Sequence, residues 1–105
     1  MNITQANNKF DKLEVKINEI LSIIPVNLIK EASELSESLR EGMEEQIERL
    51  ENKSKLNEDQ ESTLDRFQST IEAVTNIDSI LSSLTNAVEE FESLKRNIED
   101  AKETI

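Results

Sequence analysis

Apolar residues at the start of the chain recur at alternating steps of three and four positions. The set is Ile3, Ala6, Phe10, Leu13, Ile17, Ile20 and Ile24. Because an α-helix completes a turn every ~3.6 residues, this spacing puts all seven side chains on one side of a helix, as in a coiled coil. The chain is therefore expected to begin with a long helix whose apolar side packs against another element.

The composition supports a chain that is mostly helical. Only one Gly and one Pro occur among 105 residues, which leaves little material for turns. Apolar residues make up 35% of the chain and charged residues 33%. These values are typical of helices that expose one charged side and bury a narrow apolar one.

The same apolar spacing continues beyond the single proline. Its members there are Leu28, Ala32, Leu35, Leu39, Met43, Ile47 and Leu50. A proline can end a helix or kink one that continues. Because the spacing keeps its phase across Pro25, the pattern predicts one arm over residues 2–53, kinked at Pro25.

A second arm is predicted over residues 57–105, after a turn at 54–56. Asn57 is a suitable N-cap, and Gln60 three residues later completes a capping box. The apolar spacing of this arm runs through Leu64, Phe67, Ile71, Val74, Ile77, Leu81, Leu84, Val88, Phe91, Leu94 or Lys95, Ile98, Ala101 or Lys102, and Ile105. Residues 75–79 have poor helix propensity, which favours a hinge there.

These patterns predict a single all-α domain over residues 1–105, folded as a long, coiled-coil-like antiparallel helical hairpin. Folding at the turn would place Lys30 beside Asp78. The alternative is a three-helix bundle in which the chain reverses at Pro25, with helices near 3–24, 26–53 and 57–104.

The stretch 20–29 carries no charge and is apolar on most of the helix circumference. Four of its residues lie off the apolar stripe: Leu21, Ile23, Val26 and Ile29. In a lone hairpin they would form an exposed apolar patch, and such patches usually mark an interface. The alternative is that the chain folds back and buries them itself.

A row of glutamates follows the apolar stripe of the first arm. It comprises Glu34, Glu37, Glu41, Glu44, Glu48 and Glu51, in a chain of net charge −11. One interpretation is a solvated helix surface. The other is a docking strip for a basic partner, with Glu37, Glu41, Glu44 and Glu48 as its contact residues.

The residue inventory argues against several function classes. The chain has no Cys, His, Trp or Tyr, which excludes the usual zinc and haem ligands and imidazole catalysis. We therefore expect no enzyme activity, metal or cofactor. The negative charge disfavours direct binding of nucleic acid. No apolar run reaches the ~18 residues of a membrane span, and no signal peptide is evident, so we expect a cytoplasmic protein without a membrane partner.

The function expected from these features is a helical protein–protein interaction module. It would bind another helical protein or a further copy of itself, as an adaptor, a structural subunit or a chaperone-like partner. The alternative is a small acidic inhibitor that blocks a basic groove of a target such as a nucleic-acid-binding protein.

The size and hairpin plan are also similar to the small helical partners of type VII secretion. That family carries Trp-x-Gly at its turn and Tyr-x-x-x-Asp/Glu near its end. Here Gly42 has no Trp before it, and Phe91 is followed four residues later by Lys95. The resemblance implies a secretion-like helical partner as a third possibility, and no residue role is carried over from the family.

Overall fold

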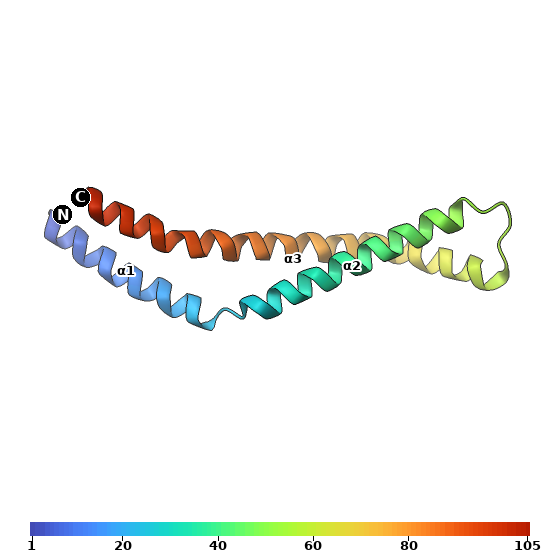
Figure 1. Cartoon of the computed structure of the whole chain (residues 1–105), viewed down its shortest axis with the longest axis horizontal. Helices are drawn as coiled ribbons and strands as arrows, with labels where there is room; N and C mark the ends of the chain where they lie inside the picture. Colours follow the sequence, from blue (N-terminus) through green and yellow to red (C-terminus); the bar gives the residue numbers. More distant parts are fainter. The chain divides into compact units, whose positions relative to one another are not determined.

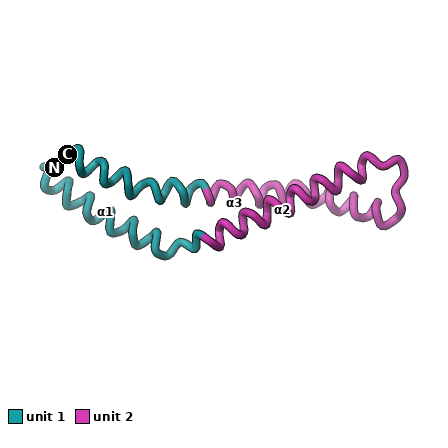
Figure 2. The backbone as a smooth tube through the Cα atoms, viewed as in Figure 1, with its two compact units in different colours: residues 1–26, 86–105 teal, residues 27–85 magenta.

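The computed structural model describes residues 1–105 and contains three α-helices and no strand (Figure 1). They are α1 (Ile3–Ile23), α2 (Val26–Glu51) and α3 (Glu58–Thr104). The predicted all-α class is confirmed. The chain divides into two compact units, residues 1–26 with 86–105 and residues 27–85, coloured separately in Figure 2.

Two asparagine caps set the starts of α1 and α3. The Oδ1 of Asn2 accepts from the backbone N–H of Gln5, whose side chain accepts from the Asn2 N–H in return. Asn57 and Gln60 make the same pair of bonds, at 2.8 and 3.1 Å, which confirms the predicted capping box. Each cap satisfies N–H groups that have no partner within the helix.

Pro25 separates two helices, whereas we expected it to kink a single arm over residues 2–53. Ile24 is extended, with ψ of 122°, and α2 begins directly after the proline at Val26. The physical reason is twofold. Proline disfavours helical backbone at the residue before it, and it lacks the N–H that a continuing helix would need.

The predicted hinge at residues 75–79 is absent, since α3 runs unbroken from Glu58 to Thr104. Low helix propensity was outweighed by packing in this segment. Val74 and Asp78 are both buried, and tertiary contacts routinely override a weak local preference.

The first unit, drawn in teal in Figure 2, pairs α1 with the last part of α3 in antiparallel directions. Ile17, Val88 and Ile98 are its buried apolar residues. Lys102 Nζ lies 2.5 Å from Asp11 Oδ1 and 3.4 Å from Glu14 Oε2. The hydrogen bond to Asp11, opposed by partial burial and aided by Glu14, raises the pKa of Lys102.

The second unit, in magenta, pairs α2 with the first part of α3 through the loop 52–57. The directions are antiparallel, because Ser36 and Arg40 contact Asp78 whereas Glu51, later in α2, contacts Gln68, earlier in α3. Met43, Leu50 and Val74 are its buried apolar residues.

The predicted pairing of Lys30 with Asp78 is wrong, since Asp78 meets Ser36 and Arg40 further along α2. The loop explains the shift. An extended residue advances the chain by ~3.3 Å and a helical residue by ~1.5 Å. The observed loop, residues 52–57, is longer than the expected turn at 54–56. It therefore extends the chain beyond the end of α2 before α3 begins.

Removing the cap of α3 provides a first test of this fold. Asn57→Ala should lower the free energy of unfolding by about 1 kcal/mol, because the Gln60 N–H loses its acceptor. Urea unfolding followed by circular dichroism measures the change. Asn52→Ala, in the same loop, is the control, and an equal effect of the two changes would contradict the assigned role of the cap.

Candidate functional site

A polar cluster lies inside the contact between α2 and α3. Arg40 Nε donates to Asp78 Oδ2 at 2.6 Å, and Ser36 Oγ donates to Asp78 Oδ1 at 2.8 Å. Arg40 also donates to Glu44 Oε2 at 3.1 Å. Asp78 is only 8% exposed, and every buried polar side-chain atom has a partner.

The charges of this cluster stabilise one another. Hydrogen bonding to Arg40 and then to Ser36 holds the pKa of Asp78 below its ordinary value of 3.8, against the opposing effect of burial. The same bond to Asp78 raises the pKa of Arg40. Because both oxygens of Asp78 are engaged, the cluster holds the two helices together and presents no free group to a ligand.

The most extensive apolar surface of the second unit lies outside this contact. We call it the outer face, and its members are Leu28, Leu35, Leu39, Ile77, Ile80 and Leu84. Their exposed fractions run from 43% to 72%. Large apolar side chains so exposed and so close along two neighbouring helices are typical of a binding surface.

Helix geometry places these residues on one side of the helix pair. The angular position of each side chain around its helix axis can be measured from the buried positions of that helix. Leu35 and Leu39 of α2 lie about a quarter turn from those positions, and so does Ile77 of α3. The direction of this rotation is the same in both helices when each is followed from its N-terminus. Since the two helices run antiparallel, equal rotations bring the residues to the same side of the pair. Asp78 lies between Ser36 and Arg40, so Leu39 is level with Ile77 and Leu35 is close to the level of Ile80.

Five of these residues were expected at the contact between the two arms: Leu28, Leu35, Leu39, Ile77 and Leu84. Their observed exposure contradicts that expectation. Each helix carries two neighbouring stripes with heptad spacing, and the contact uses the one that contains Ser36, Arg40 and Asp78. Met43, Leu50 and Val74, which are buried, lie on the predicted stripes, but Ser36, Arg40 and Asp78 do not. Polar residues in a helix contact give no apolar signal in the sequence, which is why these three positions were missed.

The four glutamates Glu37, Glu41, Glu44 and Glu48, which we call the acidic strip, occupy the opposite side of the second unit. Glu37, Glu41, Glu44 and Glu48 are all exposed, and Arg40 neighbours two of them, Glu41 and Glu44. The hydrogen bond from Gln68 to Glu51, at the end of the strip, lies on this same side of the helix pair. The carboxylates follow the helix in a row, and no three gather as ligands for a metal ion.

The predicted patch in the uncharged stretch is divided by the structure. Ile23 is 78% exposed and Val26 is also exposed, but Leu21 and Ile29 are half-buried. The expectation that all four are exposed is therefore wrong for Leu21 and Ile29. The stripe that packs along α1 keeps the predicted Phe10 and Ile17 but takes Leu21 in place of Ile20, which is exposed.

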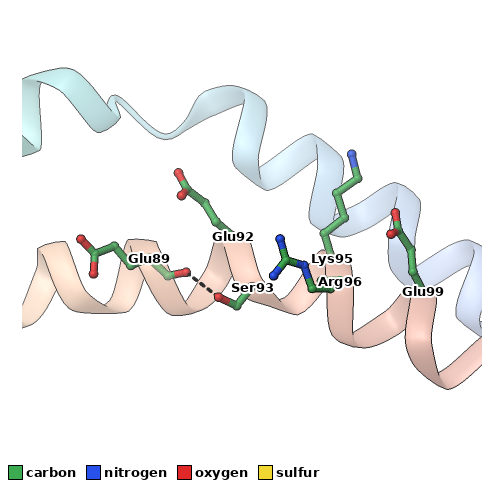
Figure 3. A pocket seen from close by; sticks show the side chains of 6 residues that line it. All are labelled: Glu89, Glu92, Ser93, Lys95, Arg96 and Glu99. Atoms are coloured by element: carbon green, nitrogen blue, oxygen red, sulfur yellow. Dashed lines mark hydrogen bonds between the residues drawn. The ribbon is translucent and has the colours of Figure 1, made fainter.

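A surface hollow of about 400 Å³ lies along the last part of α3. Glu89, Glu92, Ser93, Lys95, Arg96 and Glu99 line it, as shown in Figure 3. All six residues are exposed and come from a single helix, and Ser93 Oγ donates to the Glu89 carbonyl within that helix. Charged groups so freely hydrated lack the desolvated surroundings that binding or catalytic groups use.

None of the three helices combines the length and the apolar character needed to cross a membrane. The second unit presents two extended surfaces, the apolar outer face and the negatively charged acidic strip. No protein-family model, curated protein or solved structure matches this chain.

Proposed function

We propose that the protein is a helical interaction module that binds a helical partner through the outer face. The observation that carries the proposal is the row of large apolar side chains left exposed on one side of α2 and α3. Exposed apolar side chains on two neighbouring helices can accept the apolar side of a further helix. The role would be that of an adaptor, a structural subunit or a chaperone-like partner.

A second candidate surface lies at the break between α1 and α2. Ile23 and Val26 are exposed there, next to a proline that ends the helical backbone. We propose the interface role for these two residues, as the sequence suggested. Replacing both, Ile23→Lys with Val26→Asp, should abolish association and leave the helical content largely intact if they lie in an interface.

A second candidate function rests on the acidic strip. Glu37, Glu41, Glu44 and Glu48 form an exposed row of carboxylates that could occupy a basic groove of a target protein. Binding of this kind depends on Coulomb attraction between exposed charges, so its affinity falls steeply with ionic strength. Docking of apolar surfaces changes much less with salt.

The deciding experiment compares variants in binding to a partner captured from the native cell. Leu39→Glu with Ile77→Glu should weaken binding by about a hundredfold, because two charges would enter an apolar contact. Val15→Glu is the control, since Val15 is 55% exposed on α1, outside the outer face. Affinities are measured at low and high salt for each variant.

The outcome separates the two functions. If binding survives the outer-face change but is lost when Glu37, Glu41, Glu44 and Glu48 are replaced by Gln, and if it falls steeply with salt, the inhibitor function is correct. Loss of binding only in the outer-face variant, with little effect of salt, supports the helical module.

A further inference from the structure

The outer face has the spacing of a complete second contact stripe. Small residues complete the spacing between and beside its six members. With Ala32 and Gly42 added, the stripe on α2 is Leu28, Ala32, Leu35, Leu39 and Gly42. With Ala73 added, the stripe on α3 is Ala73, Ile77, Ile80 and Leu84, and all steps are of four or three residues. This is the heptad spacing that lets side chains of one helix insert between those of another. Helices that carry two such stripes side by side are typical of four-helix bundles.

We propose that a second copy of this chain covers the outer face, so that residues 27–85 of two copies form an antiparallel four-helix bundle. The inference rests on the proposed function, because it names the helical partner that the outer face binds. Three features of the chain support a second copy as the occupant: its exposed area, the placement of its charges and the order of large and small residues along the face.

The exposed area of the chain is larger than a compact monomer of its mass requires. The structure exposes 7990 Å², whereas a compact monomer of this size exposes about 6,000 Å². The excess of about 2,000 Å² compares with the ~800 Å² that each partner buries in a standard interface. The excess belongs to the whole chain, and the outer face is part of that exposed surface.

The placement of charges allows two acidic chains to meet on this side. Each copy carries a net charge of −11, which would oppose association through most of its surface. The six members of the outer face carry no charge, and Glu37, Glu41, Glu44 and Glu48 lie on the other side of the helix pair. Glu31 and Glu34, at the edge of the face, line a surface hollow with Leu35. Two copies can thus pack outer face to outer face with their strips pointing away from each other.

The order of large and small residues favours copies that run in opposite directions. Leu35 with Ile80 and Leu39 with Ile77 form the two central levels. Along the helix axis, Leu84 lies on one side of these levels and Gly42 lies on the other. Gly42 has no side chain, and a Cβ atom added there would meet no atom within 4 Å beyond its chain neighbours and the backbone of its own helix. A two-fold axis between the central levels would bring Leu84 of one copy to the level of the small residues Gly42 and Ala73 of the other.

Two arginines disfavour the parallel arrangement. Arg49 lies one heptad after Gly42 and Arg66 one heptad before Ala73, so both continue the outer stripe toward the loop. Parallel copies would bring four like charges to one level, which is destabilising. Antiparallel copies place the two arginine pairs at opposite ends of the bundle.

Sedimentation of the purified chain tests the proposal. At micromolar concentration the wild type should have a mass of about twice 12.0 kDa, and Leu39→Glu with Ile77→Glu should raise the dimer dissociation constant by about a hundredfold. Val15→Glu should leave the dimer unchanged. A wild type that remains monomeric, or a dimer that both changes leave intact, would overturn the proposal.

Disulfide cross-linking provides a readout that does not depend on a destabilised variant. The chain has no cysteine, so a single Ile80→Cys substitution reports one contact. Antiparallel copies bring the two positions 80 together near the axis, and oxidation should give a cross-linked dimer. Arg66→Cys, far from the axis, should give none, and cross-linking at 66 but not at 80 would refute the arrangement.

The same experiments distinguish this inference from the proposed function. A monomeric wild type whose outer-face variant still loses a captured helical protein would refute the second copy and leave the module standing. A dimer that uses the outer face, but in which Ile80→Cys does not cross-link, would refute the antiparallel arrangement alone.

Discussion

Replacing Leu50 by alanine should lower the free energy of unfolding by about 3 kcal/mol. Leu50 is 2% exposed, at the end of α2 where the loop begins, and truncation of a buried leucine removes its transfer energy and leaves a cavity. Urea unfolding at one fixed protein concentration measures the change, since association would make the midpoint depend on concentration.

The matched control is Val15→Ala, at a position that is 55% exposed. It should change the free energy of unfolding by no more than about 0.5 kcal/mol. If Leu50→Ala costs no more than this control, the packing of α2 on α3 is not as described.

Replacing Arg40 by methionine should destabilise the protein most at neutral pH. The change leaves the carboxylate of Asp78 buried with Ser36 as its only partner, and an unpaired buried charge costs more than the pair contributes. Arg49→Met, on the same helix but exposed, is the control and should have little effect.

The pH dependence follows from the lowered pKa of Asp78. Because the folded-state pKa lies below 3.8, the stabilising contribution of the ionised group is complete above about pH 4 and is lost as the pH falls through the folded-state value. The difference in stability between wild type and Arg40→Met should therefore shrink in acid. A difference that stays constant from pH 7 to pH 3 would contradict the assigned role of Arg40, and Asp78→Asn in the variant should recover part of the loss at pH 7.

The helices themselves could be predicted from the sequence because their signals are local. Asn57 with Gln60 marked the start of α3 within one residue, and the lack of Gly and Pro left no other class of fold. The effect of Pro25 was harder to predict, because an unbroken apolar phase is compatible with a kink and with a break. The backbone restrictions of the proline outweighed the side-chain pattern there.

Apolar periodicity predicted only part of the contact surface between α2 and α3: the buried Met43, Leu50 and Val74 lie on the predicted stripes, but the polar positions do not. Leu35 and Leu39 give the stronger signal, but the contact uses Ser36 and Arg40, one position round the helix. That choice depends on Asp78, which lies far away in the sequence and supplies the partner for both. A rule that counts apolar residues on one helix contains no information about such a partner.

The division of the chain into two units also orders the events of its synthesis. Residues 27–85 form one contiguous segment, so the second unit can fold as soon as residue 85 has emerged from the ribosome. Residues 1–26, although made first, need residues 86–105 as their packing partner and must wait for them. Contacts between segments so distant in sequence also close more slowly than local ones. Residues 27–85 would thus complete their packing before residues 1–26 do, with α1 held unpaired in the meantime.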